Sequence, residues 1–206
     1  MLNIEKIFQD KGALQSGHFL LTSGLHSDTY LQCALVLQYP QLAQELAAAM
    51  AAKLAGQKID VVVGPAMGGV TWAYQLGLTL GCRAIFAERS EDVMTLRRGF
   101  SVAPGERVLV AEDVATTGGS THEVVCLMKG SGAVVVGVAL IVDRTAGALN
   151  IGVPYHSLYQ LNPQTWSRED CPLCRANQPF DRPGSNKKVP TWEKSGNKGS
   201  GTSKEE

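Results

Sequence analysis

The stretch that most constrains the fold runs from residue 107 to residue 129. Its first six residues, 107–112, are apolar apart from the two at its ends. A loop of small hydroxyl residues and glycines follows, and residues 120–129 then have the composition of a helix. This order is typical of a strand that leads through a turn into a helix. Parallel strands need crossover connections of this kind, so the pattern predicts a parallel sheet.

Short apolar runs and helix-forming segments alternate on both sides of this stretch. We predict strands at residues 59–64, 83–88 and 133–142, and helices at residues 40–56 and 69–81. The fold class is therefore α/β, with a mostly parallel central sheet covered by helices on both faces. In such sheets ligands bind at the carboxyl ends of the strands. The turns after Val63, Glu112 and Val142 should therefore meet in one crevice.

Two adjacent carboxylates, Glu112 and Asp113, follow the apolar run. Carboxylates at the end of a buried strand are costly unless they bind a cation or hydrogen-bonding groups such as ribose hydroxyls. In the loop behind them, small residues let the backbone approach a ligand, and the helix N-terminus favours an anion. The stretch is therefore predicted to bind a sugar phosphate. Ser120 and Glu123 also have the spacing of a capping box, which would compete for the same N–H groups.

The chain has 206 residues, of which 44% are hydrophobic, which suits one compact domain. We assign residues 1–180 to this domain. From Asp181 onward apolar residues nearly vanish, so the segment cannot bury enough surface to offset its ordering entropy. We therefore expect residues 181–206 to form a disordered tail.

Charge and targeting signals restrict the partners and the compartment. Lys and Arg together number 19, as do Asp and Glu, so there is no basic excess to bind nucleic acid or an anionic membrane. The first residues lack the pattern of a secretory signal, and no apolar run is long enough to span a membrane. We expect a cytoplasmic protein with reduced cysteines and a charged small substrate, and without a nucleic-acid or membrane partner.

Residues 88–106, between two predicted strands, are rich in charge and glycine. They could form a hairpin arm that acts as a mobile flap over an active site, or an ordinary solvated hairpin. Their basic residues are Arg89, Arg97 and Arg98, and the segment contains neither Lys nor His.

Five segments carry a resemblance to a known family: residues 17–30, 63–69, 86–89, 95–100 and 108–120. Their order and spacing resemble those of orotate phosphoribosyltransferases, in particular a compact bacterial branch of this type I phosphoribosyltransferase family. The last segment looks like the family's signature for phosphoribosyl pyrophosphate (PRPP). The resemblance covers the chain from about Ile4 to Gly184. It implies the type I phosphoribosyltransferase fold, with an N-terminal hood at residues 1–38 and a flexible hairpin arm.

The resemblance also implies roles for individual residues. The implied catalytic residues are Glu112, Asp113 and Arg89, of which the two carboxylates would contact the ribose hydroxyls of PRPP. The PRPP-binding residues would be Arg89, Gly68, Glu112, Asp113, Val114, Ala115, Thr116, Thr117, Gly118, Gly119 and Ser120. The orotate-binding residues would be Thr116, Arg144 and Tyr30, with Tyr30 in the part of the hood that covers the base.

The implied activity is transfer of the 5-phosphoribosyl group from PRPP to orotate, giving orotidine 5′-monophosphate and diphosphate in pyrimidine (UMP) biosynthesis. No metal bound by the protein itself is expected at the active site, because Mg²⁺ would bind through PRPP and water. The resemblance further implies a homodimer with a shared active site. Two alternatives stay open: transfer to another base such as a purine, and a PRPP-sensing regulator of the same fold without catalysis.

Three features depart from the better-known members of the family. Thr22 and Gly68 stand where those members have Lys, and the arm lacks their Lys and His residues. Arginine can bind diphosphate as a permanent cation, but it cannot give up a proton. We therefore expect the arginines of the arm to stabilise the leaving group electrostatically rather than by acid catalysis.

Cys171 and Cys174 form a Cys-x-x-Cys pair, which is half of a zinc site. Two such pairs could meet across a dimer, or the pair could belong to a structural turn with free thiols. The four histidines are spread along the chain, and only His26, in the hood segment, is a candidate for contact with a substrate.

Overall fold

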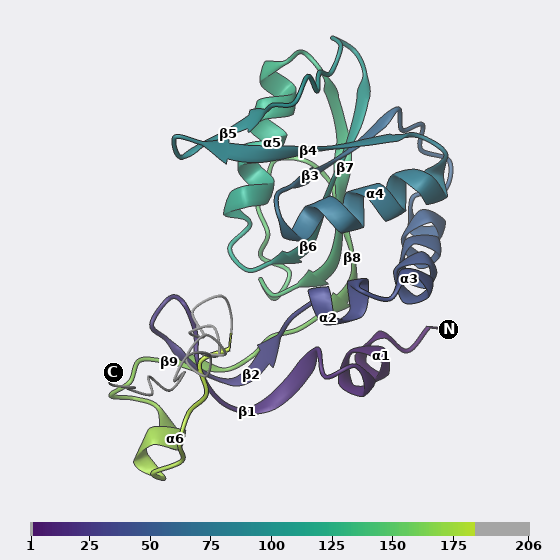
Figure 1. The fold of residues 1–206 in the computed structure, drawn as a ribbon. Coiled ribbons are helices and arrows are strands. Elements are labelled where there is room, and N and C mark those ends of the chain that lie inside the picture. Colours follow the sequence, from purple (N-terminus) through teal and green to yellow (C-terminus); the bar gives the residue numbers. More distant parts are fainter. Residues whose placement is uncertain (1, 184–206) are drawn as a thin grey trace, which may run out of the picture.

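The structure, a computed structural model, describes residues 2–183, which form a large and a small sheet (Figure 1). The large sheet has 6 strands in the order β5-β4-β3-β6-β7-β8. They are β3 (Val61–Pro65), β4 (Arg83–Ser90), β5 (Val93–Leu96), β6 (Arg107–Ala115), β7 (Val134–Asp143) and β8 (Tyr155–Gln160). All neighbours are parallel except β4 and β5. The predicted mostly parallel sheet is confirmed.

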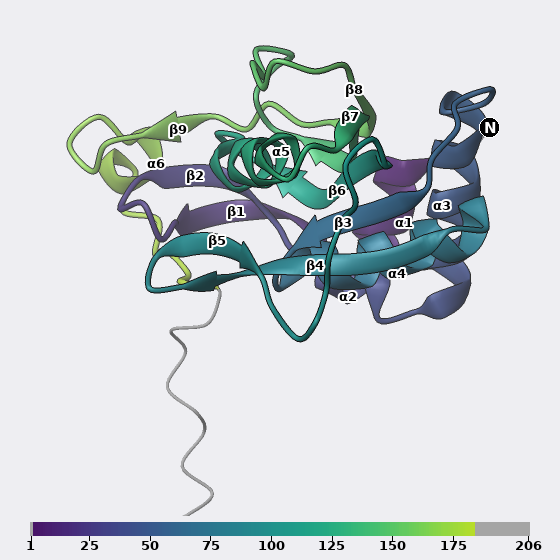
Figure 2. The same ribbon diagram turned by 90° about the horizontal axis from the view of Figure 1, so that it is seen from above.

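Helices cover both faces of the large sheet. α3 (Pro40–Lys53) and α4 (Gly68–Leu80) lie on one face and α5 (Gly119–Gly130) lies on the other (Figure 2). Val62, Leu109 and Ile141 pack into the core on the side of α3 and α4. Most of their chain neighbours pack into the core on the side of α5, namely Val61, Val63, Val108, Val110 and Leu140. Because both faces are buried, β3, β6 and β7 are apolar over most of their length instead of alternating with polar residues.

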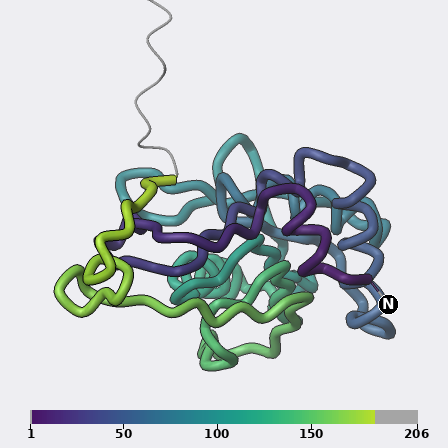
Figure 3. Tube along the Cα trace, turned by 90° about the horizontal axis from the view of Figure 1, so that it is seen from below, coloured from purple at the N-terminus to yellow at the C-terminus, as the bar shows by residue number. Residues whose placement is uncertain are grey.

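The small sheet joins the two ends of the described chain. β1 (Leu14–Leu20) and β2 (His26–Leu31) form an antiparallel hairpin, and β2 also pairs with β9 (Thr165–Trp166). Asp181 forms a bridge with Phe19, and its carbonyl accepts the N–H of Leu20 at 2.9 Å. Figure 3 shows the N-terminal trace in purple beside the C-terminal trace in yellow. The hood expected at residues 1–38 is therefore completed by the segment 165–181.

Three short helices belong to these terminal regions: α1 (Ile4–Asp10), α2 (Ala34–Leu37) and α6 (Pro172–Arg175). No helix within residues 2–183 is long and apolar enough to cross a membrane. The assignment of residues 1–180 to one domain stays a prediction. The tail predicted at residues 181–206 lies outside the described residues, apart from positions 181–183.

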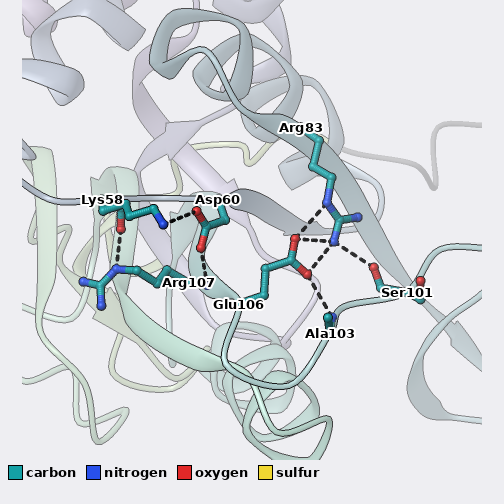
Figure 4. Close-up of polar contacts among 7 residues, drawn as sticks. All are labelled: Lys58, Asp60, Arg83, Ser101, Ala103, Glu106 and Arg107. Atoms are coloured by element: carbon teal, nitrogen blue, oxygen red, sulfur yellow. Dashed lines mark hydrogen bonds and ion pairs between the residues drawn. The ribbon is translucent and has the colours of Figure 1, made fainter.

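The predicted hairpin is formed by β4 and β5. The two residues at its turn, Glu91 and Asp92, have φ of 50° and 63°, as in the tight turns whose twist suits a hairpin. The chain then returns to β6 through a loop whose last residue forms an ion pair with the first residue of β4. Arg83 Nη2 lies 2.7 Å from Glu106 Oε1, and Glu106 also accepts the N–H of Ala103 (Figure 4). The hydrogen bond from Arg83, followed by that from Ala103, holds the pKa of Glu106 below its ordinary value.

Candidate active site

The carboxyl ends of β3, β6 and β7 meet at one edge of the large sheet. β6 lies between the other two strands. Arg144, directly after β7, donates its backbone N–H to the carbonyl of Ala115 at 2.9 Å. Gly68, behind β3, lies so close to β6 that a Cβ atom there would collide with the Asp113 carboxylate. The three turns therefore meet at one edge as expected, but they line neighbouring cavities rather than a single crevice.

The loop between β6 and α5 lines a cavity of about 260 Å³, which we call the phosphate cavity. Its lining residues are Arg89, Glu112, Val114, Ala115, Thr116, Thr117, Gly118, Gly119, Ser120 and Glu123. Gly118 is the N-cap of α5 with a φ of 78° and has no side chain to cap the helix, while Thr117 Oγ1 accepts the N–H of Gly119 at 3.4 Å. The first-turn N–H groups and the helix dipole therefore favour an anion in this cavity.

The predicted capping box is wrong. α5 begins at Gly119, so Ser120 lies inside its first turn instead of before it. Glu123 pairs with Arg89, whose Nη2 lies 2.8 Å from its Oε1. Arg89 therefore reaches the phosphate cavity from β4 of the same chain. Arg98, further along the arm, pairs instead with Glu88 at 3.1 Å.

Glu112 and Asp113 face different cavities, because successive residues of a strand point to opposite sides. Glu112 lines the phosphate cavity, whereas Asp113 lines a neighbouring cavity of about 430 Å³ together with Gly68. Burial raises the pKa of Glu112 to about 7, and the Asp113 charge adds to this although Thr121 donates a hydrogen bond to Glu112. Burial also raises the pKa of Asp113. Both carboxylates would be stabilised by a cationic or hydroxyl-bearing ligand.

A third cavity, of about 520 Å³, lies between the hood and the loop after β6, and we call it the base cavity. Tyr30 and Thr22 line it from the hood, and Thr116 and Arg144 line it from the sheet. Arg144 Nε is buried and has no hydrogen-bond partner among residues 2–183, and burial lowers the pKa of the guanidinium. Because buried donors are almost always hydrogen-bonded, this Nε–H is suited to bind an acceptor atom of a ligand. Thr116 also lines the phosphate cavity, so one ligand could occupy both cavities.

Comparison with known proteins identifies relatives that act on phosphoribosyl groups. Residues 35–168 match the family model described as the phosphoribosyl transferase domain. The orotate phosphoribosyltransferase of Caldanaerobacter subterraneus is 50% identical over 182 residues, which cover 88% of this chain and 96% of that protein. The chain belongs to the orotate phosphoribosyltransferases. The enzyme of that name from Pelotomaculum thermopropionicum is 52% identical over 184 residues, 89% of this chain and 97% of the relative.

Solved structures support the same assignment to the orotate phosphoribosyltransferases. The crystal structure of orotate phosphoribosyltransferase from Aeropyrum pernix has a TM-score of 0.62 and 28% sequence identity to this chain. The match covers 77% of this chain and 93% of that one. The type I phosphoribosyltransferase fold implied by the sequence resemblance is therefore confirmed.

Two residues at the site have roles that were not predicted from the sequence. Thr121 is fully buried and donates to Glu112, and Glu123 is the partner of Arg89. The signal for Thr121 was present: it is a hydroxyl residue at the helical spacing of the buried Val124, Val125 and Met128. Nothing local in the sequence connects Glu123 with Arg89, because the two residues are 34 positions apart.

Proposed function

We propose that the chain transfers the 5-phosphoribosyl group of PRPP to orotate, giving orotidine 5′-monophosphate and diphosphate in UMP biosynthesis. The observation that carries this proposal is the buried Nε of Arg144 in the base cavity, which has no hydrogen-bond partner among residues 2–183. Orotate brings a carboxylate, which matches the planar fork of an arginine. The names of the similar proteins from Caldanaerobacter and Pelotomaculum support the same substrate.

The proposed binding residues divide among the three cavities. The 5′-phosphate and ribose of PRPP would lie along residues 112–120, with the diphosphate toward Gly68 and Arg89. Orotate would contact Thr116 and Arg144 and stack on Tyr30. This division explains why the phosphate and base cavities share Thr116.

In the proposed reaction a ring nitrogen of orotate forms a bond to the anomeric carbon while the bond to diphosphate breaks. Early breaking of that bond leaves positive charge on the ribose, as in glycoside cleavage. Glu112 and Asp113, on the two sides of β6, would stabilise this charge in their ionised forms. Arg89 would compensate part of the charge of the departing diphosphate without giving up a proton.

Mg²⁺ is the proposed cofactor, and bound to the diphosphate it would neutralise part of the leaving group's charge. Within residues 2–183, no cluster of three or more carboxylates forms a site for a bare ion. The donor set here consists of Asp113 beside Gly68, and Glu112 on the other side of the strand. These residues fit an ion that keeps its waters and binds mainly through the substrate.

We further propose a homodimer with a shared active site. Three apolar residues lie on one exposed face of α4: Met67 at its N-cap, and Tyr74 and Leu78 further along the helix. Their exposed fractions are 82%, 68% and 67%. An apolar stripe of this kind suits a contact with a second copy of the chain. Trp72 of the same helix is instead part of the core, where its indole N–H donates to the carbonyl of Ala139.

The cytoplasm is the proposed compartment. All five cysteines are free thiols in the structure, as expected in a reducing compartment.

Consumption of orotate in the presence of PRPP and Mg²⁺ tests the proposal directly. Asp113→Asn should lower kcat by about 10²-fold or more, because one of the two charges that stabilise the ribose is lost. Its melting temperature should stay close to that of the wild type. Asp10→Asn, on the surface of α1, is the matched control and should be fully active.

Three results would contradict the proposal in different ways. Near-normal turnover by Asp113→Asn would remove the carboxylate from the mechanism. Use of adenine or another purine in place of orotate would favour the alternative base. Binding of PRPP with Mg²⁺ but no turnover with any base would favour a PRPP-sensing regulator.

A further inference from the structure

We propose that His18, His26, Cys171 and Cys174 bind a structural zinc ion that joins the hood to the C-terminal part of the described chain. Each of the four side chains offers one ligand atom, and all four atoms lie within 4.8 Å of one another. The cluster unites β1, β2 and the N-terminus of α6. The second half of the site implied by the Cys-x-x-Cys pair is therefore a pair of histidines of the same chain, rather than a second cysteine pair across a dimer.

Three of the sulfur–nitrogen distances match the edges of a zinc tetrahedron. With bonds of about 2.3 Å to sulfur and about 2.05 Å to nitrogen, tetrahedral sulfur and nitrogen ligands lie about 3.5 Å apart. The separation from His18 Nε2 is 3.4 Å for Cys171 Sγ and 3.7 Å for Cys174 Sγ, and Cys174 Sγ lies 3.4 Å from His26 Nδ1. The two ring nitrogens are 2.6 Å apart, a hydrogen-bond length. Zinc would replace that bond and move them to about 3.3 Å.

The tautomer of His18 already suits metal binding. His18 Nδ1 lies 2.8 Å from the carbonyl oxygen of Gln178, which can only accept a hydrogen bond. Nδ1 must therefore carry the proton, which leaves the lone pair of Nε2 directed at the other three ligand atoms. Ligating histidines commonly donate their second N–H in this way, which fixes the ring and raises its basicity.

The four ligands take the place of an apolar core in this part of the molecule. His18, His26 and Cys171 are 3%, 2% and 0% exposed, yet none of them belongs to either hydrophobic core. The ring of Phe180 packs edge-on against both histidines. Small sheets with few apolar side chains commonly need a metal for stability. Four protein ligands leave no open coordination position, so the ion would be structural rather than catalytic.

The ion would also stabilise one wall of the base cavity. The segment that it fixes includes Thr165 of β9, which lines that cavity together with Tyr30 of β2. His26 is therefore assigned to the metal and not to the substrate. The proposal does not depend on which base the enzyme uses, because its primary measurement is metal content.

The test uses the full chain, purified without an affinity tag or chelator. Elemental analysis should find about one zinc per chain. Replacement of the metal by Co²⁺ should give the visible absorption bands of a tetrahedral site with thiolate ligands. Both measurements use the folded wild-type protein, so they hold even if the ligand variants do not fold. Less than about a tenth of an equivalent of zinc and no such bands after Co²⁺ addition would overturn the proposal.

Variants assign the metal to these residues. Cys174→Ser and His26→Asn should each lose most of the zinc, whereas Cys126→Ser, a free cysteine exposed on α5, should retain it. Retention of zinc by both ligand variants would contradict the site, as would a disulfide between Cys171 and Cys174 in protein purified under reducing conditions. In the wild type, both thiols should react with a mercurial only as zinc is released.

Discussion

At the ends of β3 and β6, the Asp113 carboxylate occupies the space that a side chain at position 68 would need. A side chain at Gly68 would displace the Asp113 carboxylate, so the lysine that better-known family members have there is incompatible with this position of Asp113. In the proposed reaction, a cation for the diphosphate would then come from another residue. Arg89 is suitably placed, because it lines the phosphate cavity and is held there by Glu123.

The ionisation of Glu112 is a second feature that can be tested at the level of one residue. The proposed mechanism requires its charged form, so kcat/KM for PRPP should fall as the pH drops through about 7, to which burial raises the pKa of Glu112. In Glu112→Gln activity should be low, and this decrease should be absent. Glu45→Gln, on the exposed side of α3, should keep the wild-type pH profile. An unchanged acidic limb in Glu112→Gln would assign the pH dependence to another group.

The same pKa has a consequence for stability. The folded state binds the Glu112 proton more tightly than the unfolded chain, where the ordinary pKa is 4.5. The contribution of this residue to the free energy of unfolding is therefore greatest below pH 4.5 and is lost as the pH rises through about 7. The difference between wild type and Glu112→Gln in urea unfolding at a series of pH values measures it.

At the scale of elements, burial decides which parts could be predicted from sequence. The strands β3, β6 and β7 are apolar because both of their faces are covered, and each was predicted within three residues at either end. β8 was missed, because its residues are only half-buried and its sequence Tyr-His-Ser-Leu-Tyr-Gln has no apolar run. β9 has 2 residues, too few to show any period.

The residues of the candidate sites also differ in whether they could be predicted from the sequence. The loop from Glu112 to Ser120 could be predicted, because its chemistry lies in consecutive residues. The zinc ligands could not, since Cys171 and His18 are 153 positions apart and only the folded small sheet brings them together. The cysteine pair alone pointed to half a site, and the histidines carry no spacing signal that identifies them as the other half.

The hairpin of β4 and β5 is confirmed, but its role as a flap stays a prediction. If the arm closes over bound PRPP, cleavage by trypsin after Arg97 and Arg98 should slow by about tenfold or more at saturating PRPP and Mg²⁺. Mass spectrometry of the fragments distinguishes these sites from others. Cleavage after Arg175, far from the arm, should keep its rate. Equal rates at the arm with and without PRPP would favour an ordinary solvated hairpin.

For the whole molecule, the exposed stripe on α4 predicts the state of association. Tyr74→Glu would place a charge in the proposed contact, so the variant should sediment as a monomer while the wild type sediments as a dimer. Val134→Glu, at an exposed apolar residue at the start of β7, is the matched control and should stay dimeric. A monomeric wild type would refute the proposed dimer. A monomeric Tyr74→Glu with full activity would refute only the shared site.

The pairing of residues 14–31 with residues 165–181 also constrains how the enzyme is made. The hairpin of β1 and β2 is synthesised first. Its partner strand β9 and Asp181, which bridges to Phe19, follow only after the whole large sheet has been synthesised. During that interval an edge of the nascent hairpin lacks its native partner. The base cavity is therefore the last part of the candidate active site that can form on a growing chain.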